Sequence, residues 1–232
     1  MNKKLFPEFT SYMSKGEYIK SLGWLPMHMA VLPILAGWLM TQGYLSESMA
    51  NFSIYVVGMV FMLLFMGKYL RREFDPFCDR KMFCISEVCG AYVAMWFFNM
   101  AVNGLLMLIL PDENPNNAAI AAMAGQDFGM ISAMAICLAP VVEEIIFRGG
   151  IFTLARKRSR ALAYGLSMVM FSLYHVWGYA IENPINFIFL LQYLPVSYLL
   201  CRCYERTNSI WTCIFFHMMV NGMSMSAMEA ML

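Results

Sequence analysis

Long apolar windows are the feature that most constrains how this chain can fold. Seven stretches approach or exceed the roughly 18 apolar residues that indicate a membrane-spanning helix. They lie at about 22–41, 50–69, 83–110, 128–154, 161–179, 184–201 and 208–228. Charged residues make up only 13% of the 232 residues, against about 25% in soluble domains. A transmembrane barrel would show short alternating strands instead. We therefore expect an all-α, polytopic membrane helix bundle, formed by residues 1–232 as one domain.

The Lys and Arg residues lie in alternate connecting segments. Fifteen of the sixteen lie in the N-terminal segment and in segments 68–82, 155–160 and 201–207, and the sixteenth is Arg148 inside the fourth span. Segments 41–50, 111–127 and 179–184 contain none. Cytoplasmic loops carry an excess of Lys and Arg, so we expect the N-terminus and the basic segments to be cytoplasmic. A short interfacial helix at 116–126 is a candidate for an eighth helix.

Several classes of function receive no support from the sequence. The net charge is +1 and no Gly-rich phosphate loop is present, so nothing points to nucleic acid or nucleotides. The seven cysteines have no zinc-ribbon spacing, and we expect reduced thiols that pack as small hydrophobic side chains. The polar N-terminus lacks the apolar region and the cleavage site of a signal peptide.

Ionisable side chains inside the apolar spans indicate a functional site. The clearest are Glu143, Glu144, Arg148, His175 and His217. Such groups are costly at membrane depth and usually mark function. With a rise of about 1.5 Å per residue, Glu143, His175 and His217 should lie roughly 15–23 Å from the basic flanks of their helices. We therefore expect one carboxylate and two imidazoles at a similar level. His28, which lies alone in the first span, is expected to make an ordinary interhelical hydrogen bond.

Helical geometry separates the two adjacent glutamates. Residues at i and i+4 share a helix face, so Glu144 and Arg148 can pair, and the pair reduces the cost of burying the arginine. Glu143 points elsewhere and is left free for the two imidazoles. We expect it to act as a base towards water. Phe171 lies four residues before His175 and can restrict its ring by packing.

Three short motifs carry a family resemblance. They are E-E-x-x-x-R at Glu143, Glu144 and Arg148, F-x-x-x-H at Phe171 and His175, and H-x-x-x-N at His217 and Asn221. Together they resemble the motifs of the CPBP intramembrane proteases, also called the CAAX-protease or Abi family, which includes the Ras-converting-type prenyl endopeptidases. They span residues 143–221, within a motif-bearing core of helices at 128–228.

The resemblance implies a helical bundle in the membrane of a bacterial cell, with a catalytic cavity that opens to the cytoplasmic side. It also implies that Glu143 and His175 activate a water, while His217 and Asn221 stabilise the oxyanion. The substrate would be a membrane-associated protein or peptide. Family members are often described as metalloproteases, and Glu143, His175 and His217 could bind zinc in the His₂Glu manner. No H-E-x-x-H motif is present, and we expect catalysis without a metal.

Two other classes of function remain open at this stage. A non-catalytic membrane protein could bind or sequester a peptide, as a bacteriocin self-immunity factor does. A transporter could use the Glu/His cluster as a proton relay. The intact motifs favour an intramembrane endopeptidase, which is the function that we expect. No motif identifies its substrate.

Overall fold

The computed structural model describes residues 8–110 and 112–230, and every regular element in these ranges is a helix. The first long stretch combines α1 (Lys15–Pro26), the π-helical η1 (Met27–Val31) and α2 (Leu32–Thr41). It is followed by α3 (Glu47–Asp79), α4 (Lys81–Ile109) and the short α5 (Pro115–Gln126). The all-helical fold class is therefore confirmed, and α5 coincides with the candidate helix at 116–126. Lys3 and Lys4 of the basic N-terminus lie outside the described residues.

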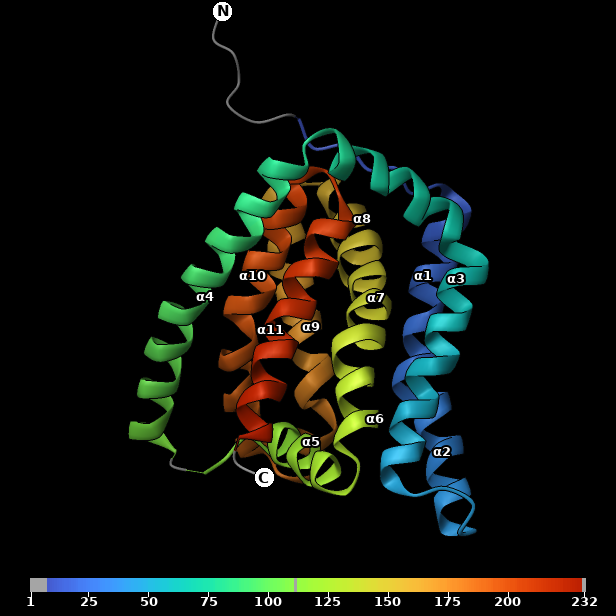
Figure 1. Ribbon diagram of the computed structural model, residues 1–232, viewed down its shortest axis with the longest axis vertical. Coiled ribbons are helices and arrows are strands. Elements are labelled where there is room, and N and C mark those ends of the chain that lie inside the picture. Colours follow the sequence, from blue (N-terminus) through green and yellow to red (C-terminus); the bar gives the residue numbers. More distant parts are fainter. Residues whose placement is uncertain (1–7, 111, 231–232) are drawn as a thin grey trace, which may run out of the picture.

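The motif-bearing part of the chain begins with a stretch in which α- and π-helical turns alternate. It comprises α6 (Phe128–Ala133), η2 (Met134–Leu138), α7 (Ala139–Glu144), η3 (Ile145–Phe152) and α8 (Thr153–Arg156). Next come α9 (Arg160–Glu182), the 3₁₀-helical η4 (Pro184–Phe189), α10 (Leu190–Thr207) and α11 (Ile210–Glu229). Figure 1 shows α9, α10 and α11 in the middle of the bundle, with α4 on one side and α1–α3 on the other.

Each of the seven expected spans falls on one of these helical stretches. Five of the described stretches are long and apolar enough to cross a membrane, and the motif-bearing helices α9 and α11 are not among them. Polar residues such as His175, His217 and Asn221 lower the apolarity of these two helices. A multi-pass membrane protein is therefore established, while the count of seven spans remains a prediction.

The stretch from Phe128 to Arg156 is the most deeply buried of the five candidate spans. In its most apolar window 61% of the residues are buried inside the protein, against 33% or less in the other four candidate spans. Small residues let α1 approach it closely: a Cβ added at Gly150 would lie 2.7 Å from Ser21 Oγ, which itself donates to the Ile145 carbonyl. Such contacts of small residues are typical of helix packing in membranes.

The third helix is longer than the apolar pattern predicts. We expected its span to end near residue 69, but α3 continues to Asp79. Tertiary contacts hold this extension in place. The buried Glu73 accepts a hydrogen bond from the Ile210 amide at the N-terminus of α11 (2.9 Å), and Trp211 Nε1 donates to the Leu70 carbonyl (2.8 Å). Figure 1 shows the end of α3 and the start of α4 passing over the end of the bundle opposite α5.

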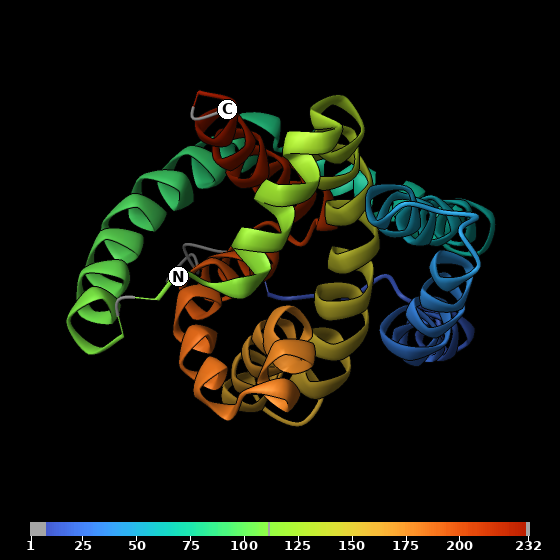
Figure 2. The same ribbon diagram turned by 90° about the horizontal axis from the view of Figure 1, so that it is seen from below.

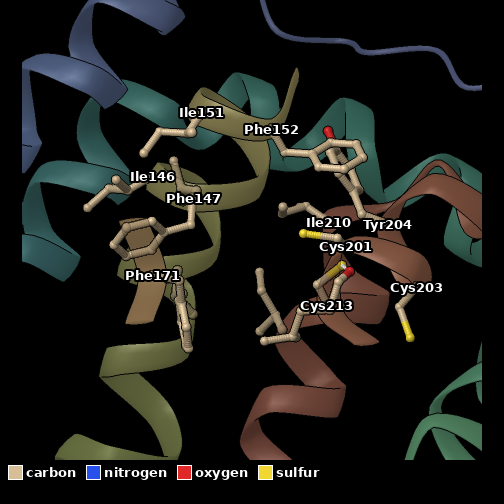
Figure 3. Close-up of a cluster of buried hydrophobic side chains, with 14 of the residues drawn as sticks. Ile146, Phe147, Ile151, Phe152, Phe171, Cys201, Cys203, Tyr204, Ile210 and Cys213 are labelled. Atoms are coloured by element: carbon tan, nitrogen blue, oxygen red, sulfur yellow. Dashed lines mark hydrogen bonds between the residues drawn. The ribbon is translucent and has the colours of Figure 1, made fainter. Parts of the chain in front are cut away.

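A dense apolar core fills the half of the bundle towards this extension. Figure 3 shows Phe147 and Phe171 facing one another, with Cys201, Cys213 and Tyr204 nearby. These five side chains are 0–1% exposed. All seven cysteines of the chain are free, and Cys84, Cys201, Cys203 and Cys213 are buried. The expected role of the cysteines as packed thiols is therefore confirmed for these four, while Cys78, Cys89 and Cys137 are exposed.

Candidate active site

The two glutamates lie where the helix of the fourth span changes its pitch. Glu143 and Glu144 end α7, with π-helical turns on both sides in η2 and η3. Wider π turns inside an α-helix occur frequently at functional sites. Here η3 carries Arg148, and the Arg148 carbonyl accepts a hydrogen bond from the Thr153 hydroxyl five residues later (2.9 Å).

The expected pair of Glu144 and Arg148 forms, and it includes a third residue. Arg148 Nη1 lies 3.0 Å from Glu144 Oε1, and both side chains are fully buried. Arg148 also donates to Ser197 Oγ (2.9 Å) and lies over the Phe171 ring. The same Glu144 oxygen lies 2.8 Å from His217 Nδ1. Glu144 therefore holds one of the imidazoles, whereas the sequence suggested that it serves Arg148 alone.

Glu143 stands between the two imidazoles, as its position on the helix predicted. Its Oε2 atom lies 3.8 Å from His175 Nε2 and 3.8 Å from His217 Nε2. This oxygen is buried and accepts no hydrogen bond from the described residues. The other oxygen, Oε1, accepts a hydrogen bond from the Tyr55 hydroxyl (2.9 Å). One carboxylate oxygen is thus held by Tyr55, and the other faces both rings without a hydrogen-bond partner among the described residues.

Hydrogen bonds on Nδ1 set the roles of the two histidines. His175 Nδ1 lies 2.9 Å from the Phe171 carbonyl. A carbonyl only accepts, so this nitrogen carries the proton and Nε2 of a neutral ring is an acceptor. His217 Nδ1 donates in the same way to Glu144. The Phe171 ring lies 4.7 Å from His175, and Tyr193 stacks on its other side at 4.5 Å. Phe171 therefore packs against the imidazole as predicted.

Asn221 lies near the site, but its amide is already engaged. Nδ2 donates to the Ala135 carbonyl at 2.8 Å, which joins α11 to η2. One of its two amide protons is therefore used in helix packing. The side chain still lines the same cavity as His217.

Three residues extend the site, of which sequence analysis did not identify Tyr55 and Tyr174 and expected only an interhelical hydrogen bond from His28. Tyr55 contacts Tyr174 through their hydroxyls (2.8 Å), and Tyr174 contacts His28 Nε2 (2.7 Å). Because Tyr55 donates to Glu143, Tyr174 must donate to Tyr55 and His28 to Tyr174. The result is one directed chain from His28 to the carboxylate. His28 makes the interhelical hydrogen bond expected of it. No local pattern marks Tyr55 and Tyr174, since phenols are ordinary in apolar spans.

The site lies at the inner end of a cavity of about 570 Å³. Ligand pockets usually measure about 300–1,000 Å³. The cavity contains Glu143, Phe171, His175, His217 and Asn221 in its wall. It extends from their level towards α5, away from the basic segments. The apolar core of Figure 3 lies in the other half of the bundle. The expected opening of the cavity to the cytoplasmic side stays a prediction.

The donor set, as placed, does not fit a zinc ion. The carboxylate oxygen of Glu143 lies 3.8 Å from the Nε2 atom of either imidazole. If both atoms bound zinc at about 2.0–2.2 Å, the O–Zn–N angle would be about 135°, well above the tetrahedral value. Across the described parts of the chain, no group of three His, Cys, Asp or Glu residues is arranged to hold a metal ion.

Comparison with known proteins agrees with the motifs. Residues 125–223 match the family model described as type II CAAX prenyl endopeptidase Rce1-like. A Bacillus subtilis (strain 168) protein named "Putative membrane peptidase YdiL" is 27% identical over 138 residues, which cover 58% of this chain and 52% of the relative. The chain thus spans about half the length of this curated relative. No solved structure gives a significant match. The resemblance inferred from the three motifs is confirmed.

Proposed function

We propose that this protein is an intramembrane endopeptidase, since residues 125–223 match the family model of the Rce1-like CAAX prenyl endopeptidases. It hydrolyses a peptide bond of a membrane-associated protein or peptide within a bacterial cell membrane, and the bilayer is its environment. The observation that carries the proposal is the Oε2 atom of Glu143. This oxygen has no hydrogen-bond partner among the described residues, is buried at the end of a cavity and lies 3.8 Å from each of two imidazoles.

Glu143 and His175 are the residues that activate the attacking water. A water beside Glu143 Oε2 can donate one proton to the carboxylate and the other to Nε2 of His175. Both acceptors belong to side chains whose other ends are fixed, by Tyr55 and by the Phe171 carbonyl. The water then attacks the substrate carbonyl while Glu143 takes its proton, as a general base does. Glu143 later returns this proton to the leaving amine.

His217 and Asn221 are the candidates for stabilising the tetrahedral intermediate. When His217 carries both protons, Nδ1–H binds Glu144 and Nε2–H is left to donate to the oxyanion. Asn221 keeps a second amide proton besides the one that binds Ala135. Arg148 and Glu144 act through His217: they hold its ring in place and do not touch the reacting atoms. No step requires a metal.

Comparative peptidomics of membranes tests this function directly. The wild type is compared with Glu143→Gln and with the matched control Glu113→Gln, which changes an exposed carboxylate in the segment before α5. A precursor should accumulate in the first variant only. If no peptide differs between Glu143→Gln and the wild type, the protein is not a peptidase, and the peptide-binding or immunity function becomes the better account.

A further inference from the structure

We infer that the cavity admits its substrate from the face of the membrane opposite the basic segments, as an extended, uncharged stretch of peptide. By the positive-inside rule this is the non-cytoplasmic face. The inference rests on the proposed function for the identity of the occupant, whereas the direction of the opening rests on the fold alone.

The cavity wall begins at the level of the catalytic residues and continues to the α5 end. On α11, which starts near the basic segment 201–207, the first wall residue is His217 and the last is Met228. On α9 the wall starts at Phe171, eleven residues beyond Arg160. The helix α5 supplies Asn117, which is exposed. Figure 2 views the bundle from the α5 end.

The other half of the bundle is closed by packed side chains. Every residue of η3, from Ile145 to Phe152, is buried. Phe152 lies between Phe9 and Tyr204, at ring-centroid distances of 5.5 and 6.0 Å. Tyr204 in turn bonds to Tyr69 and Glu73. A peptide that approached Glu143 from the basic face would have to displace this core.

The chemistry of the wall matches a peptide backbone better than charged side chains. Among the described residues that form the wall, Glu143 is the only Asp, Glu, Lys or Arg. Seven carboxamides contribute to it: Asn51, Asn99, Asn103, Asn116, Asn117, Gln192 and Asn221. Backbone groups inside a membrane must find hydrogen-bond partners when they are not helical. Carboxamides both donate and accept, so they can serve an unwound segment.

The length of the cavity limits the segment that it can hold. His217 and Met228 are eleven residues apart on α11, which corresponds to about 16 Å along the helix. An extended chain covers this distance with about five residues. Five consecutive uncharged residues on one side of the cleaved bond are therefore the expected signature of a substrate.

Thiol labelling of the whole protein tests the direction of the opening. The three exposed cysteines, Cys78, Cys89 and Cys137, are replaced by Ser, and single thiols are then restored or introduced. Cys78 near the end of α3 reports the basic face. Ser224→Cys reports the cavity wall, and Met223→Cys is its matched control, since Met223 lies at the same depth outside the wall. A membrane-impermeant maleimide is applied to sealed right-side-out and inverted vesicles.

We expect Ser224→Cys to react from the non-cytoplasmic side only, at least about tenfold faster than Met223→Cys, and Cys78 to react from the other side. The four buried cysteines should react only after denaturation, which confirms that each variant is folded. Reaction of Ser224→Cys from the same side as Cys78, or no faster than Met223→Cys, overturns the inference.

The positions of the cleavage sites distinguish an error in this inference from an error in the proposed function. The labelling needs no activity, so it gives its answer even if the protein is not a peptidase. When peptidomics yields substrates that depend on Glu143, their cleavage sites should lie in the non-cytoplasmic half of a membrane segment. Sites in the cytoplasmic half, or charged residues throughout the five-residue stretches on both sides of the cut, contradict the stated substrate class and leave the peptidase itself established.

Discussion

Two isosteric changes at adjacent positions should both reduce cleavage, but only one of them should lower the stability of the fold. Glu143→Gln removes the proposed base and keeps the shape of the side chain. Tyr55 can still donate to the amide oxygen, and the other end of the new amide faces two Nε2 atoms at 3.8 Å. We expect the free energy of unfolding to change by no more than about 1 kcal/mol. Cleavage should fall by about 10²–10⁴-fold, the usual contribution of a general base.

Glu144→Gln should destabilise the fold as well as reduce activity. Its Oε1 atom accepts from Arg148 (3.0 Å) and from His217 (2.8 Å), and both partners are buried. Removing one charge of a buried pair costs about 3–5 kcal/mol, because the other charge remains without compensation. At about 2–4 °C per kcal/mol for a chain of this size, the melting temperature should fall by roughly 6–20 °C.

Thermal unfolding and cleavage are measured for both variants, and for Arg148→Met, in one detergent. The double variant Glu144→Gln/Arg148→Met serves as the control, because it removes both charges and should lose less stability than the sum of its single changes. The assigned roles are wrong if Glu143→Gln is as unstable as Glu144→Gln. They are also wrong if Glu144→Gln keeps its melting temperature and loses cleavage, since the two roles would then be exchanged.

Two further predictions concern the surroundings of Glu143. Prolonged chelation should leave cleavage unchanged, and purified protein should carry much less than one zinc per chain by elemental analysis; activity that is lost on chelation and restored specifically by zinc would refute metal-free catalysis. Tyr55→Phe removes the donor to Glu143 Oε1, so kcat should fall about tenfold with KM nearly unchanged, in line with about 1.5 kcal/mol for a hydrogen bond to a charged group. An unchanged kcat would show that Tyr55 does not position the carboxylate.

The sequence by itself determined the features that depend on composition and on neighbours along one helix. Apolar windows and the alternation of basic segments predicted a bundle of membrane helices. Helical periodicity predicted the pair of Glu144 and Arg148, and it left Glu143 on another face. The helical rise, counted from the basic flanks, predicted a common depth for His175 and His217. Each of these inferences needs only the rise and the period of a helix, which are the same in every fold.

Only the tertiary structure decided which side chains meet across the bundle. His217 binds Glu144 across 73 positions of the chain, Tyr55 binds Glu143 across 88, and His28 reaches Tyr174 across 146. No local period encodes such pairs, because they depend on the order, rotation and tilt of helices that pack far apart in sequence. The direction of the cavity has the same origin. Phe147, Phe152 and Tyr204 fill one half of the bundle, so the cavity can extend only into the other half. Such packing arises only when the helices are assembled.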